Sequence, residues 1–509
     1  MTQPNDARRL AYALAACVLA VHVLVALLTP YEFHRDEFLY FSMGTHLRLF
    51  HMDFPPLIAL LSEAVRHTIG VSVFTYRLVP GIVGTGLVAL VLLAVRRFGG
   101  GRMAMLLAAG AMLSSPLFMR TASLFQPVVL DQLAWMAVLY ALVRLEQTGD
   151  RRWWLAIGAA GGLGLLAKFS IAFLGVGVLV ALLATPHRRA LLTRGPWFAL
   201  LIALVIGSPS VIGQVTNDWP IFAQMAELQR GQLDRVTWGA YAGFQILFIG
   251  PAMIIAIAGL LALLRGSLAQ HRTIAVACAS TFLLLGALHG KPYYVGPIYP
   301  ILLAAGAVRI EQLSGRWRGI AAWGVGLTAL AFGLLFLPVG LPIVPPEPMA
   351  RYASAMGIQA ATQTNRGTQL SLPQDYADMT GWREKAEAVA RVVESLTPAE
   401  RAAVVIYGDN YGQAGALDLY GRRLGLPPVV SLAGSFYLFG PGARRGDVIV
   451  TLGAGADDLQ GLSCASLTDA GRVKNRWGVP EELDVPILIC RSPKLTVQEI
   501  WRRNHPHWG

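Results

Sequence analysis

The segment that decides the fold runs from Leu10 to Tyr40 and reads LAYALAACVLAVHVLVALLTPYEFHRDEFLY. Residues 10–28 are almost wholly apolar, and as a helix they are long enough to cross the ~30 Å hydrocarbon core of a membrane. The run is too long for the apolar core of a signal peptide, and no small-residue cleavage site follows it. We therefore expect a retained membrane helix that delivers the charged residues 32–37 to a membrane surface.

Apolar runs of similar length recur along the chain as far as Pro338, and none appears beyond Pro345. Only 14% of the 509 residues are charged, whereas a soluble chain would carry about 25%. We therefore expect a polytopic α-helical membrane protein with about eleven spans, followed by a soluble C-terminal domain. The predicted spans cover residues 10–29, 77–95, 103–119, 127–144, two spans within 153–185, 196–213, 238–264, 272–288, 296–310 and 319–338.

The net charge of +12 comes mostly from arginines in the short loops between these runs, such as Arg96-Arg97 and Arg188-Arg189. This is the distribution of cytoplasmic loops rather than of a nucleic-acid-binding surface, so we expect no nucleic-acid partner. It places the N-terminus inside, and the first loop, residues 30–75, outside together with the soluble domain. A single tilted helix over 153–185 would invert everything after it, but the arginines at 188–194, 265–272 and 316–318 argue against that.

Two domains follow from the change in composition, a membrane domain over 1–340 and an extracytoplasmic domain over 341–509. The proline-rich stretch 341–348 has the composition of a stiff linker. Strand-length apolar runs at 402–407, 447–452 and 485–490 alternate with helical patterns at 381–396 and 411–423, which favours a small α/β domain. Cys464 and Cys490 lie in this domain, and spacing alone leaves open whether they form a disulfide.

Carboxylates in the first outer loop are the first candidates for chemistry. Asp36 and Glu37 precede a stretch, 38–50, with the apolar spacing of an interfacial helix, and Asp53 precedes Pro55-Pro56. Acidic groups on both sides of an interfacial helix suit chemistry on a lipid head group. The alternative is that these charges keep the loop solvated and that Asp36 caps the helix.

Further ionisable residues are expected at the same membrane depth. Asp131 lies in the first turn of a predicted span, Lys168 interrupts the apolar stretch 165–169, and His289 and Lys291 precede another span. Ionisable groups within a membrane are costly and are functional candidates by default. Alternatively, Asp131 favours the helix dipole and the lysines extend to the interface. Acids and cations on one leaflet together fit an anionic lipid phosphate and a base.

At these residues the sequence resembles the family 39 glycosyltransferases of the GT-C fold, which use polyprenyl-phosphate sugars. The resemblance rests on residues 35–40, 53–57, 162–168 and 291–297, and residues 410–416 with 420–421 resemble a bacterial branch of the family. The family includes protein O-mannosyltransferases and the transferases that add aminoarabinose to lipid A. Phe54 stands where the latter carry a lysine. The resemblance implies a GT-C-like membrane domain in the bacterial inner membrane.

The resemblance also implies roles for individual residues. Asp36 would be the catalytic carboxylate, with Glu37 beside it. Lys168, with Arg35 or Lys291, would hold the donor phosphate, and Tyr294 matches a tyrosine near the donor. The candidate substrate-binding residues are Asp53, Arg35, Lys168, Lys291, Tyr294, Asp131 and His289. Asp36, Glu37 and Asp53 leave a divalent cation open, although two carboxylate positions are a poor metal signature; no other cofactor is expected.

The function that these features predict is transfer of a sugar, with inversion, from a polyprenyl-phosphate donor lipid to an acceptor hydroxyl on the extracytoplasmic face. The acceptor would be an envelope protein, lipid or polysaccharide. A transporter or flippase of a lipid-linked sugar is the alternative, and a scaffold that presents the soluble domain is a third. Transporters often carry internal repeats with sites at the midplane, whereas this sequence has no evident repeat and its acids gather on one side.

Overall fold

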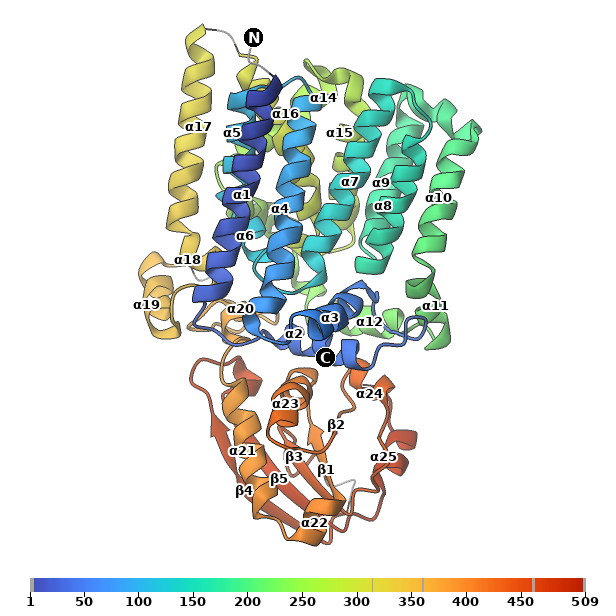
Figure 1. The fold of residues 1–509 in the computed structure, drawn as a ribbon, viewed down its shortest axis with the longest axis vertical. Helices are drawn as coiled ribbons and strands as arrows, with labels where there is room; N and C mark the ends of the chain where they lie inside the picture. The colour runs from blue at the N-terminus through green and yellow to red at the C-terminus, as the bar shows by residue number, and fades with distance from the viewer. Residues whose placement is uncertain (1–3, 314, 359–360, 460–462, 507–509) are drawn as a thin grey trace.

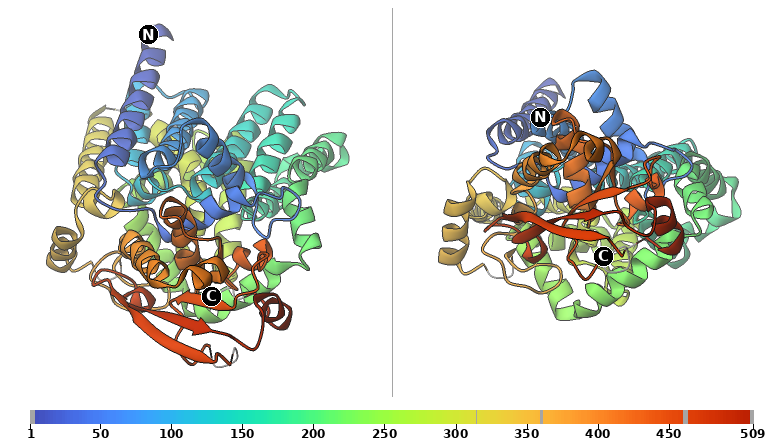
Figure 2. Two further views of the ribbon diagram at one scale, coloured as in Figure 1. Left: turned by 60° about the horizontal axis from the view of Figure 1, so that its bottom comes forward. Right: turned by 90° about the horizontal axis from the view of Figure 1, so that it is seen from below.

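The computed structural model describes residues 4–313, 315–358, 361–459 and 463–506. Figure 1 shows a bundle of long helices above a smaller body built on a sheet. Seen from below, the sheet lies across the ends of the membrane helices (Figure 2). The two bodies meet at short helices from the first loop, α2 (Arg35–Thr45) and α3 (Leu57–Thr68).

Hydropathy and length identify fewer straight membrane helices than expected. Within the described ranges, five helical segments are long and apolar enough to span a membrane, and up to eight if each bent pair counts as one span. The predicted count of about eleven is therefore not confirmed. The five are α1 (Pro4–Leu28), α4 (Val73–Arg97), α7 (Pro127–Thr148), η4 (Pro292–Ile298) with α16 (Tyr299–Glu311), and α17 (Gly315–Leu335).

The remaining apolar helices are short or bent. Two short ones are α5 (Arg102–Leu113) and α8 (Trp153–Ala167). The bent pairs are α9 (Ile171–Ala184) with η1 (Pro186–Leu192), α10 (Arg194–Ile206) with α11 (Ser208–Thr216), and α13 (Trp238–Ile249) with α14 (Ala252–Arg265). A helix α15 (Arg272–Ala287) and the short α6 (Pro116–Thr121) and α12 (Pro220–Gly231) complete this part.

Two breaks in helices, at Lys168 and at Gly250, bear on the spans predicted from the sequence. Lys168 is extended, with φ −162° and ψ 139°, and separates α8 from α9, so 153–185 is not one long helix. The span predicted at 238–264 is a bent pair of helices, because α13 and α14 meet at 109°. Gly250 lies between them at φ 52°, a conformation that favours glycine, and Pro251 follows without a main-chain N–H group.

The start of α2 is fixed by its own sequence. The His34 side chain accepts a hydrogen bond from the Asp36 amide, and the Glu37 carboxylate accepts one from the His34 amide at 2.7 Å. This reciprocal capping box satisfies two of the amide groups that a helix start leaves without a partner. The capping box thereby fixes the first turn of α2, from which the Asp36 side chain extends.

The C-terminal part contains a five-stranded mixed sheet in the order β2-β1-β3-β5-β4. Its parallel strands β1 (Val404–Gly408) and β3 (Val448–Leu452) are almost wholly buried and read as continuous apolar runs, as parallel strands do. The other strands are β2 (Val429–Val430), β4 (Ser466–Lys474) and β5 (Asp484–Arg491). Helices of this part include α18 (Leu337–Gly340), α19 (Pro346–Met356), α20 (Gln374–Ala377), α21 (Trp382–Ser395), α22 (Pro398–Ala403), α23 (Tyr411–Arg423), α24 (Ser435–Phe439) and α25 (Val497–Arg503). Cys464 and Cys490 form a disulfide.

The first loop packs into the core of this α/β part. Phe38 on α2 is fully buried, and its ring lies 5.6 Å from Trp382 and 5.5 Å from Tyr420. A Cβ atom on Gly415 would come within 2.7 Å of the Phe38 Cβ atom, so the close approach of α23 to α2 depends on glycine. The loop between the first two long helices is thus held by residues nearly four hundred positions later in the chain.

Candidate active site

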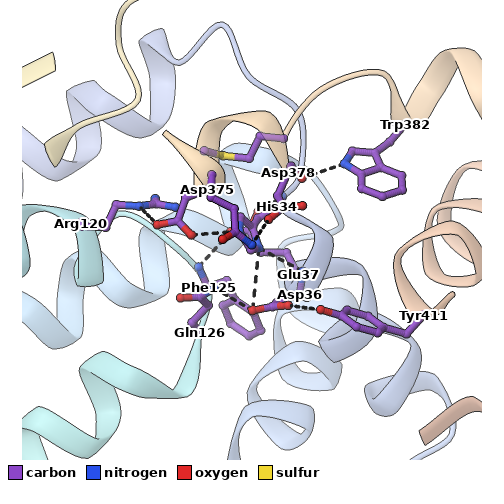
Figure 3. Close-up of polar contacts among 12 residues, drawn as sticks. His34, Asp36, Glu37, Arg120, Phe125, Gln126, Asp375, Asp378, Trp382 and Tyr411 are labelled. Atoms are coloured by element: carbon purple, nitrogen blue, oxygen red, sulfur yellow. Dashed lines mark hydrogen bonds and ion pairs between the residues drawn. The ribbon is translucent and has the colours of Figure 1, made fainter. Parts of the chain in front are cut away.

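Asp36 lies where three distant segments of the chain meet (Figure 3). Its Oδ1 atom accepts a hydrogen bond from the Tyr411 hydroxyl at 3.0 Å. Its Oδ2 atom accepts one from the Gln126 side-chain amide at 3.0 Å. Tyr411 begins α23 and Gln126 precedes α7, so the C-terminal part and a membrane helix both hold this carboxylate.

A row of acidic and basic side chains extends from Asp36 away from Tyr411. His34 Nδ1 lies 3.9 Å from Asp36 Oδ2, and its Nε2 lies 3.5 Å from Asp375 Oδ1. Arg120 donates from Nε to the other oxygen of Asp375 at 2.7 Å. Burial lowers the pKa of His34, but Asp375 and Asp36 outweigh burial, so the pKa of His34 is raised above its ordinary value. Burial raises the pKa of Asp375, but Arg120 and His34 outweigh it and hold that pKa well below its ordinary range.

Glu37 is held differently from its neighbour Asp36. It is fully buried and forms an ion pair with Arg77 at 3.1 Å, which is also buried. It accepts further hydrogen bonds from the amides of His34 at 2.7 Å and Phe125 at 2.9 Å. Burial by itself raises the pKa of Glu37, but Arg77 and these hydrogen bonds outweigh burial. The pKa is therefore below its ordinary value, and the carboxylate stays charged. These contacts fasten α2 to α4 and to the loop before α7.

Arg35 faces the C-terminal part. Its guanidinium group lies over the Tyr411 ring, 4.5 Å from the centroid, and its Nη1 atom lies 2.9 Å from Glu481 Oε1. The sequence made Arg35 a candidate for the donor phosphate. Its contacts in the structure connect α2 with the start of α23 and with Glu481, and its role toward the phosphate stays a prediction.

Two half-buried lysines, Lys168 and Lys291, lie on the membrane side of the site. Lys168 Nζ lies 4.7 Å from the centroid of the Tyr294 ring and 5.2 Å from that of Tyr293. The charges that act on Lys291 are those of Lys168, Asp36 and Asp375. Burial, followed by the nearby charge of Lys168, lowers the pKa of Lys291 to about 8. Neither lysine lies in an ion pair with a carboxylate among the described residues.

Asp131 lies beside this pair of lysines. It interacts electrostatically with Lys168. It accepts hydrogen bonds from Ser170 at 2.7 Å and from the Trp135 indole at 2.9 Å. The sequence therefore named groups that the structure does bring together, namely Asp36, Lys168, Lys291, Tyr294 and Asp131.

Two candidates have other surroundings. Asp53 Oδ2 accepts a hydrogen bond from Ser435 at 2.8 Å, and Gln214 donates to its main-chain oxygen at 2.5 Å. Burial raises the pKa of Asp53 to about 6. His289 Nδ1 lies 2.9 Å from the Val236 carbonyl, at an exposed turn. Within the described part of the chain, no group of three or more His, Cys, Asp or Glu residues is placed to hold a metal ion.

Several residues of this arrangement were not candidates from the sequence. They are His34, Gln126, Asp375, Arg120 and Tyr411. Tyr411 lies in the stretch 410–416 that carried part of the family resemblance, and His34 precedes the acidic pair. Asp375 follows the proline-rich stretch and has no sequence signal of its own.

An apolar cavity of about 570 Å³ opens among the helices α1, α4, α5, α6 and α17. Its lining is almost wholly apolar, with Leu87, Phe118 and Leu330 among its walls. Thr121 and Gln132 lie in its lining, and Thr121 follows Arg120 directly in the chain. A cavity of this kind among membrane helices can receive a hydrocarbon chain.

The comparison with family models matches part of the chain to a family of membrane mannosyltransferases. The sequence model of the family described as dolichyl-phosphate-mannose-protein mannosyltransferase matches residues 53–212. The predicted resemblance to this family and the GT-C fold are confirmed. No curated protein matches the chain in sequence.

Solved structures with a similar fold include ArnT. The crystal structure of ArnT from Cupriavidus metallidurans bound to undecaprenyl phosphate superposes with a TM-score of 0.64 at 16% identity, covering 94% of this chain and 97% of that one. The apo structure of the same protein gives a TM-score of 0.63 at 17% identity, with the same shares covered. The chain therefore has the fold of ArnT over nearly its whole length.

Proposed function

We propose that the protein is an integral membrane glycosyltransferase that moves a sugar from a polyprenyl-phosphate donor to an acceptor hydroxyl, with inversion at the sugar. The observation that carries the proposal is the grouping of Asp36 with two half-buried lysines, Lys168 and Lys291, that have no carboxylate ion pair in the described part of the chain. Buried charges are normally paired. An anionic phosphate beside a carboxylate base would complete the charge balance.

Asp36 is the proposed base. The acceptor hydroxyl gives its proton to the carboxylate as its oxygen bonds to the sugar C1 atom, which requires hydrogen-bond distance between them. The bond from C1 to the phosphate oxygen breaks, and the lipid phosphate leaves with the electron pair. Lys168 and Lys291 offset the negative charge of that phosphate, and the buried surroundings make each interaction stronger than in water.

Glu37 has a different role in this proposal. Its carboxylate is occupied by Arg77 and by two main-chain amides, and it is fully buried. A group so placed holds the loop rather than touching a substrate. We assign His34 and Asp375 a supporting role on other grounds, since His34 lies between the carboxylates of Asp36 and Asp375 and Arg120 holds Asp375.

A lipid donor agrees with two further features. One crystal structure of ArnT contains undecaprenyl phosphate. In this chain the apolar cavity among α1, α4, α5, α6 and α17 offers space for an isoprenoid or acyl chain. The acceptor would be a protein, lipid or polysaccharide of the cell envelope.

The cysteine pair supports an extracytoplasmic site. Cys464 and Cys490 are joined in the C-terminal part, and disulfides persist in oxidising compartments such as the periplasm. We infer that residues 1–340 form the membrane domain of a bacterial inner-membrane protein and that residues 341–509 lie outside. Asp36 would then act at the outer surface.

Transfer of a radiolabelled sugar tests the proposal. The purified protein is given a set of polyprenyl-phosphate sugars and cell-envelope fractions, alongside Asp36→Asn and a matched control, Asp447→Asn, whose side chain is exposed. We expect transfer by the wild type and by the control, and a loss of about 10²–10⁴-fold in Asp36→Asn. Undiminished transfer by Asp36→Asn would exclude the base assignment. A folded wild type that transfers nothing, yet moves the donor across proteoliposomes, would establish the transporter alternative.

A further inference from the structure

Tyr411 connects the C-terminal α/β part directly to the proposed base. Its hydroxyl donates to Asp36 Oδ1 at 3.0 Å across a separation of 375 residues in sequence. Figure 3 shows its ring extending from the C-terminal side toward the carboxylate. Burial raises the pKa of Tyr411, so the hydroxyl keeps its proton and remains a donor.

The position of Tyr411 is fixed from within its own part of the chain. Asn410 caps α23 by accepting hydrogen bonds from the amides of Gly412 and Gln413. The Asn410 side chain also donates to Glu482 Oε1 at 2.8 Å. Glu482 in turn pairs with Lys385 at 2.7 Å, and both of these side chains are buried. A helix start anchored by a buried ion pair holds its first residue in a defined place.

The Tyr411 ring is also held from the side of α2. Arg35 lies over one face of the ring and forms an ion pair with Glu481, so α2 contacts the C-terminal part on both sides of this guanidinium group. A Cβ atom on Gly412 would come within 2.7 Å of Arg35 Cγ, which shows how closely the start of α23 approaches α2. Ring and hydroxyl therefore have separable roles, since the ring contacts Arg35 and the hydroxyl donates to Asp36.

We propose that Tyr411 is a positioning residue for the transfer reaction and that the C-terminal domain completes the catalytic site through it. The inference rests on the proposed function of Asp36. Tyr411 holds one carboxylate oxygen while Gln126 holds the other, which fixes the plane of the carboxylate toward the acceptor hydroxyl. A base held in this way needs no reorientation at the moment of proton transfer.

The kinetic test removes the hydroxyl and keeps the ring. Tyr411→Phe is compared with Tyr437→Phe, a control in the same domain whose hydroxyl donates to the main-chain carbonyls of Trp501 and Asn504 at the end of α25. We expect kcat to fall about 10-fold in Tyr411→Phe, the value of a charge-assisted hydrogen bond, with KM for the donor unchanged. In the Asp36→Asn background the same substitution should produce no further loss. Equal, additive losses in both backgrounds, or an unchanged kcat, would overturn the proposal.

A spectroscopic readout tests the contact without requiring transfer. The infrared carboxylate band of Asp36 is assigned as the band that Asp36→Asn removes. We expect that band to shift in Tyr411→Phe and to stay in place in Tyr437→Phe. A band unmoved in both variants would overturn the inference. A shifted band in a protein that transfers no sugar would retain the contact and reject only the proposed function.

Discussion

The buried pair of Glu37 and Arg77 gives a prediction whose size follows from the structure. Glu37→Gln keeps the shape of the side chain but leaves the guanidinium charge of Arg77 in a site that is 1% exposed. Removing one partner of a buried ion pair costs about 3–5 kcal/mol, because the remaining charge is left without compensation. The cost should fall on α2 and on its attachments to α4 and Phe125.

Hydrogen exchange of the α2 amides measures this effect. We expect exchange through local opening to be more than about 100-fold faster in Glu37→Gln, since 1.4 kcal/mol corresponds to a factor of ten. Glu37→Gln combined with Arg77→Met removes the lone charge and should recover part of the protection. The wild-type protection should also fall on acidification through the lowered pKa of Glu37, because the charged form is the one that the fold stabilises. If the α2 amides of Glu37→Gln exchanged at the wild-type rate while sugar transfer was abolished, the structural role would be refuted and Glu37 would be a catalytic group.

Two further predictions concern the other ionisable groups. The pKa of Asp53 is raised to about 6, so the folded protein holds this proton more tightly than the unfolded chain does; stability should fall by about 2 kcal/mol as pH rises from about 4 to 6. Asp53→Asn should flatten that dependence in thermal melts, and an unchanged slope would contradict it. The pKa of Lys291 is lowered to about 8. The affinity of the protein for undecaprenyl phosphate should therefore be higher below pH 8, where Lys291 is charged, and should fall progressively above it. Lys291→Met should weaken binding at least 10-fold at pH 7 and remove the pH dependence around 8, whereas exposed Lys474→Met should change neither; equal binding by Lys291→Met would exclude Lys291 from the phosphate site.

Features that depend on local sequence could be predicted. The long helices α1, α4 and α7 follow from apolar length alone, and the break at Lys168 follows from a polar residue within an apolar run. The group of Asp36, Asp131, Lys168 and the residues at 291–294 was found because membrane-level charges are unusual. The bend at Gly250 was missed, since hydropathy does not respond to backbone direction.

Features that depend on long-range packing could not be predicted. Asp36 and Glu37 are adjacent acids that look equivalent in sequence, and only the position of Arg77 on α4 distinguishes them. Tyr411 and Asp375 reach the site because the first loop enters the core of the C-terminal part. Pairings across such separations leave no periodic or compositional trace in a single chain.

The central claim is that Asp36 is the base of a sugar transfer from a polyprenyl phosphate. The most direct measurement follows wild type and Asp36→Asn in parallel, with undecaprenyl-phosphate binding and sugar transfer recorded on the same preparations. The account predicts that Asp36→Asn binds the lipid phosphate as the wild type does, while transfer falls by about 10²–10⁴-fold. Transfer at the wild-type rate by Asp36→Asn, or a wild type that binds the lipid phosphate but transfers no sugar from any donor, would contradict it.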